Sequence, residues 1–395
     1  MTGSVEARAR PQRLSPVEML ERLVAFDTTS RLSNLPLIHF VRDYLASWGV
    51  ESLLIPSDDG SKASLYATIG PRDRGGIALS GHTDVVPVDN QAWSTDPWRL
   101  TARDGKLYGR GSCDMKGFVA TALAHVPDFL ARPLRQPIHL ALSYDEEVGC
   151  LGVRPMIAEL RANHPLPRAV IVGEPTMMAV VDAHKGTRRY RTEINGKEAH
   201  SSMPQIAANA AMAAGELIAE LARLSREFMQ RGDPSGRFEP PYTSLQVTRI
   251  ESGGALNIIP RHARFYWETR LLPDADPDEP LDRLAAFAEQ LLPGLRAVER
   301  TASIATTVIA GVVGLKPAPG SAAEQLAMRL TGANRTFAVP YATEGGLFQE
   351  AEMPAIVCGP GDIAQAHQPD EFITLAQIEE CSRFMLRLAD HAAQG

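Results

Sequence analysis

The stretch 77-IALSGHTD-84 joins a short apolar run to side chains that can bind a metal ion. Residues 77–80 are predicted to form a buried strand, because short apolar runs are typical of sheets covered on both faces. His82 and Asp84 follow two positions apart, so in extended chain they share one face. Asp84 can then accept the second ring N–H of His82, as carboxylates do beside metal-bound histidines. A hydrogen-bonded histidine in a polar loop is the alternative for this stretch taken alone.

Further apolar runs on both sides of this stretch alternate with helical segments. Expected strands lie at residues 64–69, 138–143 and 169–172, and expected helices at 117–126 and 153–161. The same texture returns later, with strands at 306–313 and 355–358 and a helix at 375–391. Strands that alternate with helices predict an α/β domain with a mixed, mostly parallel sheet, formed by residues 1–183 and 298–395.

Residues 184–297 have a different pattern and are expected to form a separate domain inserted into the α/β chain. Residues 188–194 alternate in polarity like a half-exposed strand, and residues 207–228 form a long amphipathic helix. Strands at 244–250 and 263–271 and a helix at 280–292 follow. This β-α-β-β-α order, completed if one more strand follows, is the ferredoxin-like α+β arrangement.

Chemically active side chains follow the other predicted strands as well. Glu146 and Glu147 come after the strand at 138–143, Glu174 follows the strand at 169–172, and His367 lies in the loop after 355–358. Asp114 lies in the glycine-rich loop 109-GRGSCDMKG-117 and precedes a predicted helix. Each has an ordinary alternative, such as a helix cap for Asp114 or a solvated acidic turn for residues 145–147.

Together these residues predict a metal site. In open α/β sheets ligands bind outside the carboxyl ends of the strands, which is where His82, Glu147, Glu174 and His367 are expected. Two histidines and several carboxylates suit a divalent metal such as zinc. A phosphate-binding loop is not supported, because the glycine spacing does not match that motif.

Composition excludes several other classes of protein. The 395 residues carry a formal net charge of −7, unlike the basic surface of a nucleic-acid-binding protein. The four cysteines are widely spaced and are expected to be reduced thiols. No apolar run is long enough to span a membrane, and residues 1–11 lack the apolar core of a signal peptide. We therefore expect a cytoplasmic protein that binds neither membranes nor nucleic acid.

From about residue 15 to the C-terminus, the chain resembles the dinuclear-zinc deacylases and exopeptidases. The motifs that carry the resemblance are GHTDVVP (81–87), GRGSCDMKG (109–117), DEEVG (145–149), GEPT (173–176) and NIIP (257–260). Within that family it looks most like the acetylornithine deacetylase group, through LYGRGSCDMKGF (107–118), DEEVGCLGVRPMI (145–157) and Thr343-Glu344-Gly345. Asn90 and Gly345 depart from the Gly and Ala usual in that group, although asparagine tolerates a left-handed backbone.

The resemblance implies a role for each matching residue. His82 and Glu174 would hold one metal ion, Glu147 and His367 would hold the other, and Asp114 would bridge the two and be followed by a cis peptide. Asp84 would orient His82, and Glu146 would be the general base and acid.

The inserted domain would be a lid and dimerisation domain. His200 would stabilise the oxyanion, reaching in from the partner subunit of a homodimer. Asn257 would face the active site, and Arg270 would bind the substrate carboxylate. Glu344 is a candidate partner for a cationic substrate side chain, and a surface turn residue is the alternative.

The implied activity is metal-dependent hydrolysis of a linear amide. N2-acetyl-L-ornithine would give L-ornithine and acetate, a step of arginine biosynthesis, with the help of two divalent ions, zinc in the first place and cobalt as the alternative. Other N-acyl-amino-acid deacylases, desuccinylases and dipeptidases of the same family stay open. A non-catalytic relative that binds metal or an amino acid is the alternative from a different class.

Overall fold

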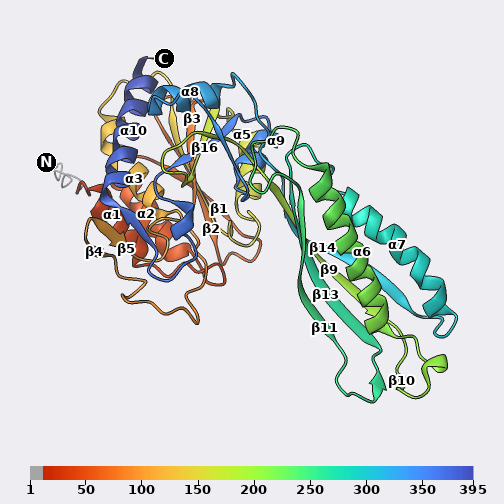
Figure 1. Ribbon diagram of the computed structural model, residues 1–395. Coiled ribbons are helices and arrows are strands. Elements are labelled where there is room, and N and C mark those ends of the chain that lie inside the picture. Colours follow the sequence, from red (N-terminus) through yellow and green to blue (C-terminus); the bar gives the residue numbers. More distant parts are fainter. Residues whose placement is uncertain (1–11, 395) are drawn as a thin grey trace, which may run out of the picture. The chain divides into compact units, whose positions relative to one another are not determined.

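The computed structural model describes residues 12–394, which divide into two compact units (Figure 1). The first unit contains the described residues up to Asp182, together with Ala318–Thr336 and the chain from Leu347 onward. The second unit contains Ala183–Pro317 and Phe337–Gly346. Residues 1–11, which we expect not to be a signal peptide, lie outside the described part of the chain.

The largest sheet is mixed and has eight strands, in the order β1-β2-β6-β3-β7-β16-β8-β15. Its strands are β1 (Ser52–Pro56), β2 (Ala63–Ile69), β6 (Ile138–Ser143), β3 (Ile77–His82), β7 (Ala169–Pro175), β16 (Ala355–Gly359), β8 (Val181–His184) and β15 (Phe337–Val339). The neighbours β6, β3, β7 and β16 are parallel, whereas β1, β2 and β8 pair antiparallel. The expected α/β fold is confirmed, and the carboxyl ends of four parallel strands meet at one edge.

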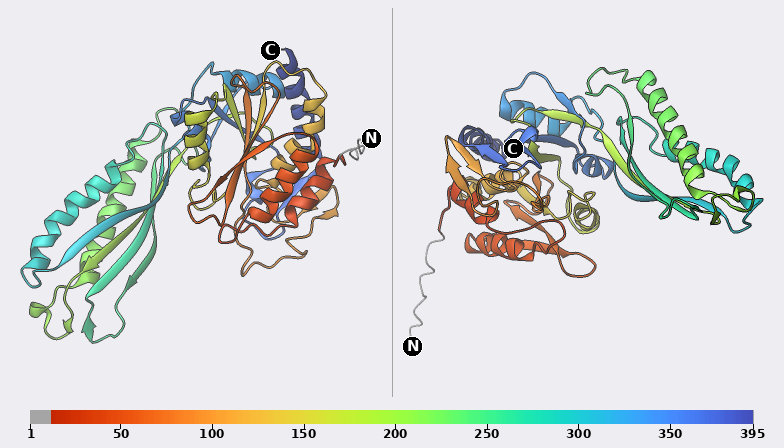
Figure 2. Two further views of the ribbon diagram at one scale, coloured as in Figure 1. Left: turned by 180° about the vertical axis from the view of Figure 1, so that it is seen from behind. Right: turned by 60° about the horizontal axis from the view of Figure 1, so that its bottom comes forward.

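Helices cover both faces of this sheet (Figure 2). Leu65, Leu79, Leu140 and Ile171 point into one large core. The helices that share this core are α1 (Pro16–Val24), α2 (Leu35–Ser47), α3 (Lys116–Ala124), α8 (Ala322–Thr331) and α10 (Leu375–Gln394). On the opposite face α5 (Val153–Asn163) lies against β2 and β6. Burial on both faces explains why these strands are continuous apolar runs.

Local sequence sets the ends of the first helices. The Ser15 hydroxyl accepts the Glu18 N–H at 3.3 Å, and the Glu18 carboxylate accepts the Ser15 N–H at 2.8 Å. This capping box, with Pro16 in the first turn, begins α1. Gly49 takes a left-handed φ of 76° just after α2, a conformation in which a side chain would be strained.

A small three-stranded sheet links two loops that are distant in sequence. Its strands are β4 (Thr101–Arg103), β5 (Lys106–Tyr108) and β17 (Phe372–Thr374). Phe372 pairs with Tyr108, so the chain just before the loop 109–117 runs beside the chain just after residue 371. The remaining helices of the first unit are α4 (Val126–Leu130) and α9 (Gly345–Glu350), of which α9 begins at the end of the second unit.

The second unit is an antiparallel sheet with α6 and α7 packed on one face (Figure 1). Its elements are β9 (Gly186–Asn195), α6 (Ala210–Arg231), β11 (Ser244–Ser252), β13 (His262–Leu271), α7 (Glu279–Arg296) and β14 (Ser303–Val312). The strand order β11-β13-β9-β14 is the ferredoxin-like arrangement expected from the sequence. Stacked rings of Tyr190 and Trp267, 3.8 Å apart, lie in its core.

The assignment of the strand at 306–313 to the α/β domain is wrong. β14 pairs with β9, with Thr306 opposite Thr192, and it completes the sheet of the second unit. That unit therefore continues to Pro317 instead of ending at residue 297. The local pattern could not place this strand, because periodicity predicts a strand without naming the sheet that it joins.

The cysteines and the apolar character of the helices were the subject of two expectations from composition. All four cysteines, Cys113, Cys150, Cys358 and Cys381, are free and buried. Burial raises the pKa of the Cys358 thiol to about 12, which keeps it protonated at neutral pH. Among the described residues, no helix has the length and apolar character that crossing a membrane requires.

Buried His139 makes the stability of the first unit sensitive to acid. Its Nδ1 lies 3.0 Å from Thr68 Oγ1, and burial together with nearby His164 lowers its pKa from 6.5 to about 4. As the pH falls, this histidine is protonated in the unfolded chain before it is protonated in the folded protein. The folded protein therefore loses stability as the pH falls from about 6.5 towards 4. Urea unfolding would measure the free energy of unfolding at pH 7 and at pH 5. We expect this free energy to fall by about 2 kcal/mol less in His139→Leu than in the wild type.

The matched control for this measurement is His39→Asn, which changes an exposed histidine on α2. Its loss of stability between the two pH values should equal that of the wild type. Equal losses for His139→Leu and wild type would show that the buried ring is not the acid-sensitive group.

Candidate metal centre

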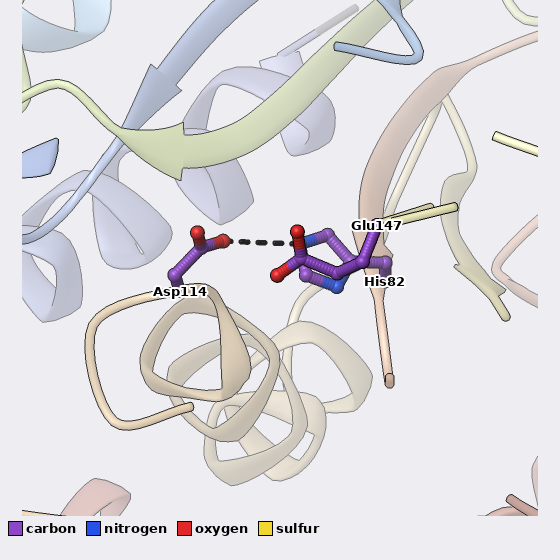
Figure 3. Close-up of side chains that lie close together, drawn as sticks. All are labelled: His82, Asp114 and Glu147. Carbon is purple, nitrogen blue, oxygen red and sulfur yellow. Dashed lines mark hydrogen bonds and ion pairs between the residues drawn. The ribbon is translucent and has the colours of Figure 1, made fainter. Parts of the chain in front are cut away.

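The edge where the parallel strands end brings the predicted ligands together. His82 is the last residue of β3, and Glu174 lies near the end of β7. Glu147 follows β6, and His367 lies in the loop after β16. Asp114 comes from the loop before α3 and faces His82 and Glu147 (Figure 3). Segments far apart in sequence thus supply one cluster, as the carboxyl-end rule predicts.

Asp114 lies between the two histidines. Its Oδ1 is 3.1 Å from His82 Nε2, and its Oδ2 is 3.4 Å from His367 Nε2. His82 Nε2 is also 3.6 Å from Glu174 Oε1, and His367 Nε2 is 3.1 Å from Glu147 Oε2. Each carboxylate oxygen of Asp114 is therefore directed to a different histidine.

Among the described residues, two groups of three side chains could each hold a metal ion. Within each group, the potential ligand atoms all lie within 4.8 Å of one another. One is His82, Asp114 and Glu147, and the other is His82, Glu146 and Glu174. Nitrogen and carboxylate donors in this mixture suit zinc and related divalent ions. Glu146, expected to be the base, thus lies near the first histidine, whereas His367 belongs to neither group.

Burial and crowding shift the charges of this cluster. Burial and the Asp114 carboxylate raise the pKa of Glu147, and they raise that of Glu174 well above its usual range. Burial opposes protonation of His82, but Glu174 and Asp114 outweigh it and raise the pKa of the ring well above 6.5. Hydrogen bonds to Asp114 and Glu147 raise the pKa of His367 to about 10. The cluster therefore requires positive charge, and a divalent cation can supply it in place of protons.

Asp114 does not cap α3, contrary to the alternative considered for it. The residue before the helix is Met115, which makes no side-chain cap bond. The Asp114–Met115 peptide is cis, as the family resemblance implied.

Asp84 contacts His82 through its backbone carbonyl, whereas the sequence predicted a contact through its carboxylate. His82 Nδ1 lies 2.9 Å from the backbone carbonyl oxygen of Asp84 and 3.6 Å from its carboxylate. The carboxylate instead accepts the N–H groups of Glu146 at 3.0 Å and Glu147 at 3.3 Å, and the Ser30 hydroxyl at 2.7 Å. Asp84 therefore holds His82 through its main chain and the acidic loop through its side chain.

The loops that carry the ligands contain strained backbone. Residues with left-handed φ values near the centre are Asp145 (56°), Cys150 (53°), Met177 (53°), Met178 (58°) and His367 (63°). Such conformations are uncommon outside glycine and persist only where surrounding contacts impose them. One such contact is the ion pair of Lys62 with Asp145, at 2.5 Å. Away from these loops, Asn90 takes φ 59°, the left-handed conformation expected at that position.

Close packing explains the glycine that precedes Glu174. A Cβ on Gly173 would lie 2.1 Å from the ring of Phe118 on α3. On the neighbouring strand, a Cβ on Gly359 would lie 2.0 Å from the carbonyl oxygen of Gly173. Only glycine allows β7 to pass between these neighbours, so the packing determines where Glu174 is presented.

The residues expected to contact substrate all belong to the second unit. His200 is exposed and lies on β10 (Ala199–His200), which pairs with β12 (Ile258–Ile259). Asn257 directly precedes β12, and its carbonyl oxygen accepts the Ser201 N–H at 2.9 Å, so the chain at His200 runs close to Asn257. Arg270 lies on β13, with its Nε 3.3 Å from Glu268 Oε1. Glu344 is only 1% exposed, so the surface-turn alternative for this residue is wrong.

Two buried charged residues beside the centre carry little signal in the sequence. Arg110 and Glu371 are each about 1% exposed, and Arg110 Nη1 lies 2.7 Å from Glu371 Oε2. Glu371 follows His367 in a polar segment that resembles an ordinary surface loop. Only the position of Arg110 between two glycines of a tight loop could have suggested burial.

Comparison with known proteins shows what this chain resembles over most of its length. The sequence pattern of Peptidase family M20/M25/M40 matches residues 78–391. The acetylornithine deacetylase of Myxococcus xanthus is 35% identical over 389 residues, which cover 95% of this chain and 97% of that protein. The enzyme of the same name from Yersinia pseudotuberculosis is 34% identical over 385 residues, 94% of each chain.

Solved structures show the same fold at lower identity. A tripeptidase from Staphylococcus aureus superposes with a TM-score of 0.75 at 16% identity, covering 98% of this chain and 100% of its own. The two-unit architecture is therefore shared. From the matched region and the near-full-length relatives, the chain belongs to Peptidase family M20/M25/M40.

Proposed function

We propose that this protein hydrolyses N2-acetyl-L-ornithine to L-ornithine and acetate. The observation that carries the proposal is the similarity, over nearly the whole chain, to proteins named acetylornithine deacetylase. It is supported by the cluster of His82, Asp114 and Glu147, residues of the motifs by which the sequence resembles that group.

The proposed centre takes two divalent ions, zinc in the first place and cobalt as the alternative. His82 and Glu174 would hold one ion, Glu147 and His367 the other, and Asp114 both. The proposal is supported by the two oxygens of Asp114, each within 3.4 Å of a different histidine nitrogen. When bound, such ions acidify a water molecule and polarise an acyl carbonyl.

Glu146 is proposed to move the proton that hydrolysis requires. It would accept the proton of the attacking water and donate it to the departing amine, which leaves only when protonated. The Glu147 carboxylate lies 3.1 Å from His367 Nε2. Glu146 instead lies beside His82 and Glu174, and its carboxylate accepts a hydrogen bond from the Cys150 thiol at 3.3 Å. Adjacent glutamates therefore have different surroundings, which suits one for coordination and the other for proton transfer.

Replacing Glu146 tests this assignment. Glu146→Gln keeps the size of the side chain but removes the proton acceptor, so we expect kcat to fall at least about 100-fold with metal content unchanged. Glu159→Gln, a change of one carboxylate on α5, is the matched control. A Glu146→Gln enzyme that retains more than a tenth of the wild-type rate would refute the role.

Asp84 is proposed to assist by holding both His82 and the acidic loop. In Asp84→Asn, an amide NH₂ would face the N–H of Glu146 or Glu147 in place of an acceptor. We expect metal affinity or kcat/KM to fall about 10–100-fold, as for other residues that support metal ligands. Asp128→Asn, which alters an ion pair with Arg13, should change neither quantity. Wild-type values for Asp84→Asn would contradict the proposal.

Glu344 is proposed to select the cationic side chain of ornithine, and Arg270 to bind the substrate carboxylate. Burial of Glu344 supports a specific role, because glutamate is seldom so buried in an ordinary surface turn. A guanidinium such as that of Arg270 can bind a carboxylate through two hydrogen bonds.

A substrate panel tests this selectivity. We expect kcat/KM for N-acetyl-L-ornithine to exceed that for N-acetyl-L-methionine and N-succinyl-diaminopimelate by at least about 100-fold, and a chelator to abolish all activity. Glu344→Gln should reduce the preference over acetylmethionine. If it leaves that ratio unchanged, selection lies elsewhere. If another substrate leads in the wild type, the protein is a different deacylase of the family.

We further propose that the second unit acts as a lid and dimerisation domain in a cytoplasmic homodimer that serves arginine biosynthesis. His200 would stabilise the oxyanion of the tetrahedral intermediate, and Asn257 would face the substrate. Exposure of the His200 side chain and its nearness to Asn257 support a shared role for this pair.

A further inference from the structure

The Glu371 carboxylate accepts several backbone hydrogen bonds from the loop that carries Asp114. Its Oε1 accepts the N–H of Cys113 at 2.9 Å and of Asp114 at 3.0 Å. Its Oε2 accepts the N–H of Gly111 at 3.0 Å and Arg110 Nη1 at 2.7 Å. The side chain is 1% exposed, so these bonds replace solvent entirely.

The same network reaches the loop that carries His367. Arg110 Nη2 donates to Gln91 Oε1 at 2.5 Å, and Gln91 Nε2 donates to the His367 carbonyl oxygen at 2.9 Å. Glu371 is itself in the His367 loop, and its own carbonyl accepts the Gly109 N–H at 3.0 Å. The two loops are therefore joined by hydrogen bonds on both sides of the buried Arg110–Glu371 ion pair.

We propose that Glu371 is a positioning residue that sets the placement of Asp114 relative to His367, and thereby the affinity for the metal ion that these residues share with Glu147. The inference rests on the proposed two-ion centre. Without the carboxylate, three backbone N–H groups of the Asp114 loop would lose their acceptor in a site from which water is excluded, which is costly. The loop would then rearrange and take Asp114 with it.

The effect should differ between the two ions. His82 and Glu174 lie on β3 and β7, which are fixed by parallel pairing within the large sheet. His367 lies in a loop, and that loop is joined to the Asp114 loop through Glu371, Arg110 and Gln91. Loss of Glu371 should therefore weaken the ion at Glu147 and His367 more than the ion at His82 and Glu174.

The test is titration of the full-length protein, freed of metal, with Co²⁺ by calorimetry and visible absorption. Glu371→Gln presents an NH₂ to two donors whichever way the amide is turned. We expect the wild type to bind two equivalents, and the variant to bind the second about 10–100-fold more weakly and the first with a clearly smaller loss. The absorption of the second equivalent should change with it.

His139→Leu is the control for a merely structural effect, because it alters another buried polar side chain of the same unit. It should change stability and leave both Co²⁺ affinities intact. Wild-type affinities for Glu371→Gln, or equal weakening of both equivalents, would overturn the positioning role. A wild type that binds fewer than two equivalents would instead overturn the two-ion centre itself.

Gln91→Leu provides a second variant if Glu371→Gln does not fold. It removes the bond to the His367 carbonyl and the bond from Arg110 Nη2, and it removes no hydrogen bond to Glu371. We expect a smaller loss of affinity, confined to the second equivalent. Unchanged affinity for that equivalent would contradict the link between the two loops.

Discussion

Mutual repulsion among buried carboxylates is the constraint on which the rest of this site depends. Asp114 and Glu174 are at least nine-tenths buried, and Glu147 lies beside them. Burial and the Asp114 carboxylate raise the pKa values of Glu147 and Glu174, whereas His367 and His82 outweigh burial and lower the pKa of Asp114. Only positive charge makes their ionised forms compatible with burial. The cluster is therefore built for a cation, and the surrounding protein must hold it against its own repulsion.

The fold meets this constraint with rigid strands and with hydrogen-bonded loops. Parallel pairing fixes His82 and Glu174 at the ends of β3 and β7. Asp84 and Glu371 act on the loops, since each carboxylate accepts the backbone N–H groups of residues that carry or adjoin ligands. These acceptors stabilise loop conformations that neither propensity nor packing alone would favour. The left-handed residue Asp145 directly precedes the two N–H groups that Asp84 accepts.

The second unit shows that local pattern and domain membership are separate questions. Its central elements were predictable, because β9, β13, α6 and α7 have clear periods of two or of 3.6 residues. β14 was assigned to the wrong sheet, since its sequence predicts a strand but not the partner that completes it. Glu344 was equally ambiguous, because burial in a return segment of the chain leaves no periodic signal.

By itself the sequence determined the α/β class, the inserted ferredoxin-like unit and most of the side chains that meet at the edge where the parallel strands end. Short apolar runs and the polar residues that end them are local properties, and a shared strand edge follows from parallel pairing. Tertiary structure alone decided that the Asp84 carboxylate supports the acidic loop and that Glu371 joins two loops through Arg110 and Gln91. Those contacts join segments as many as 276 positions apart, and no local pattern encodes which donor will meet which acceptor.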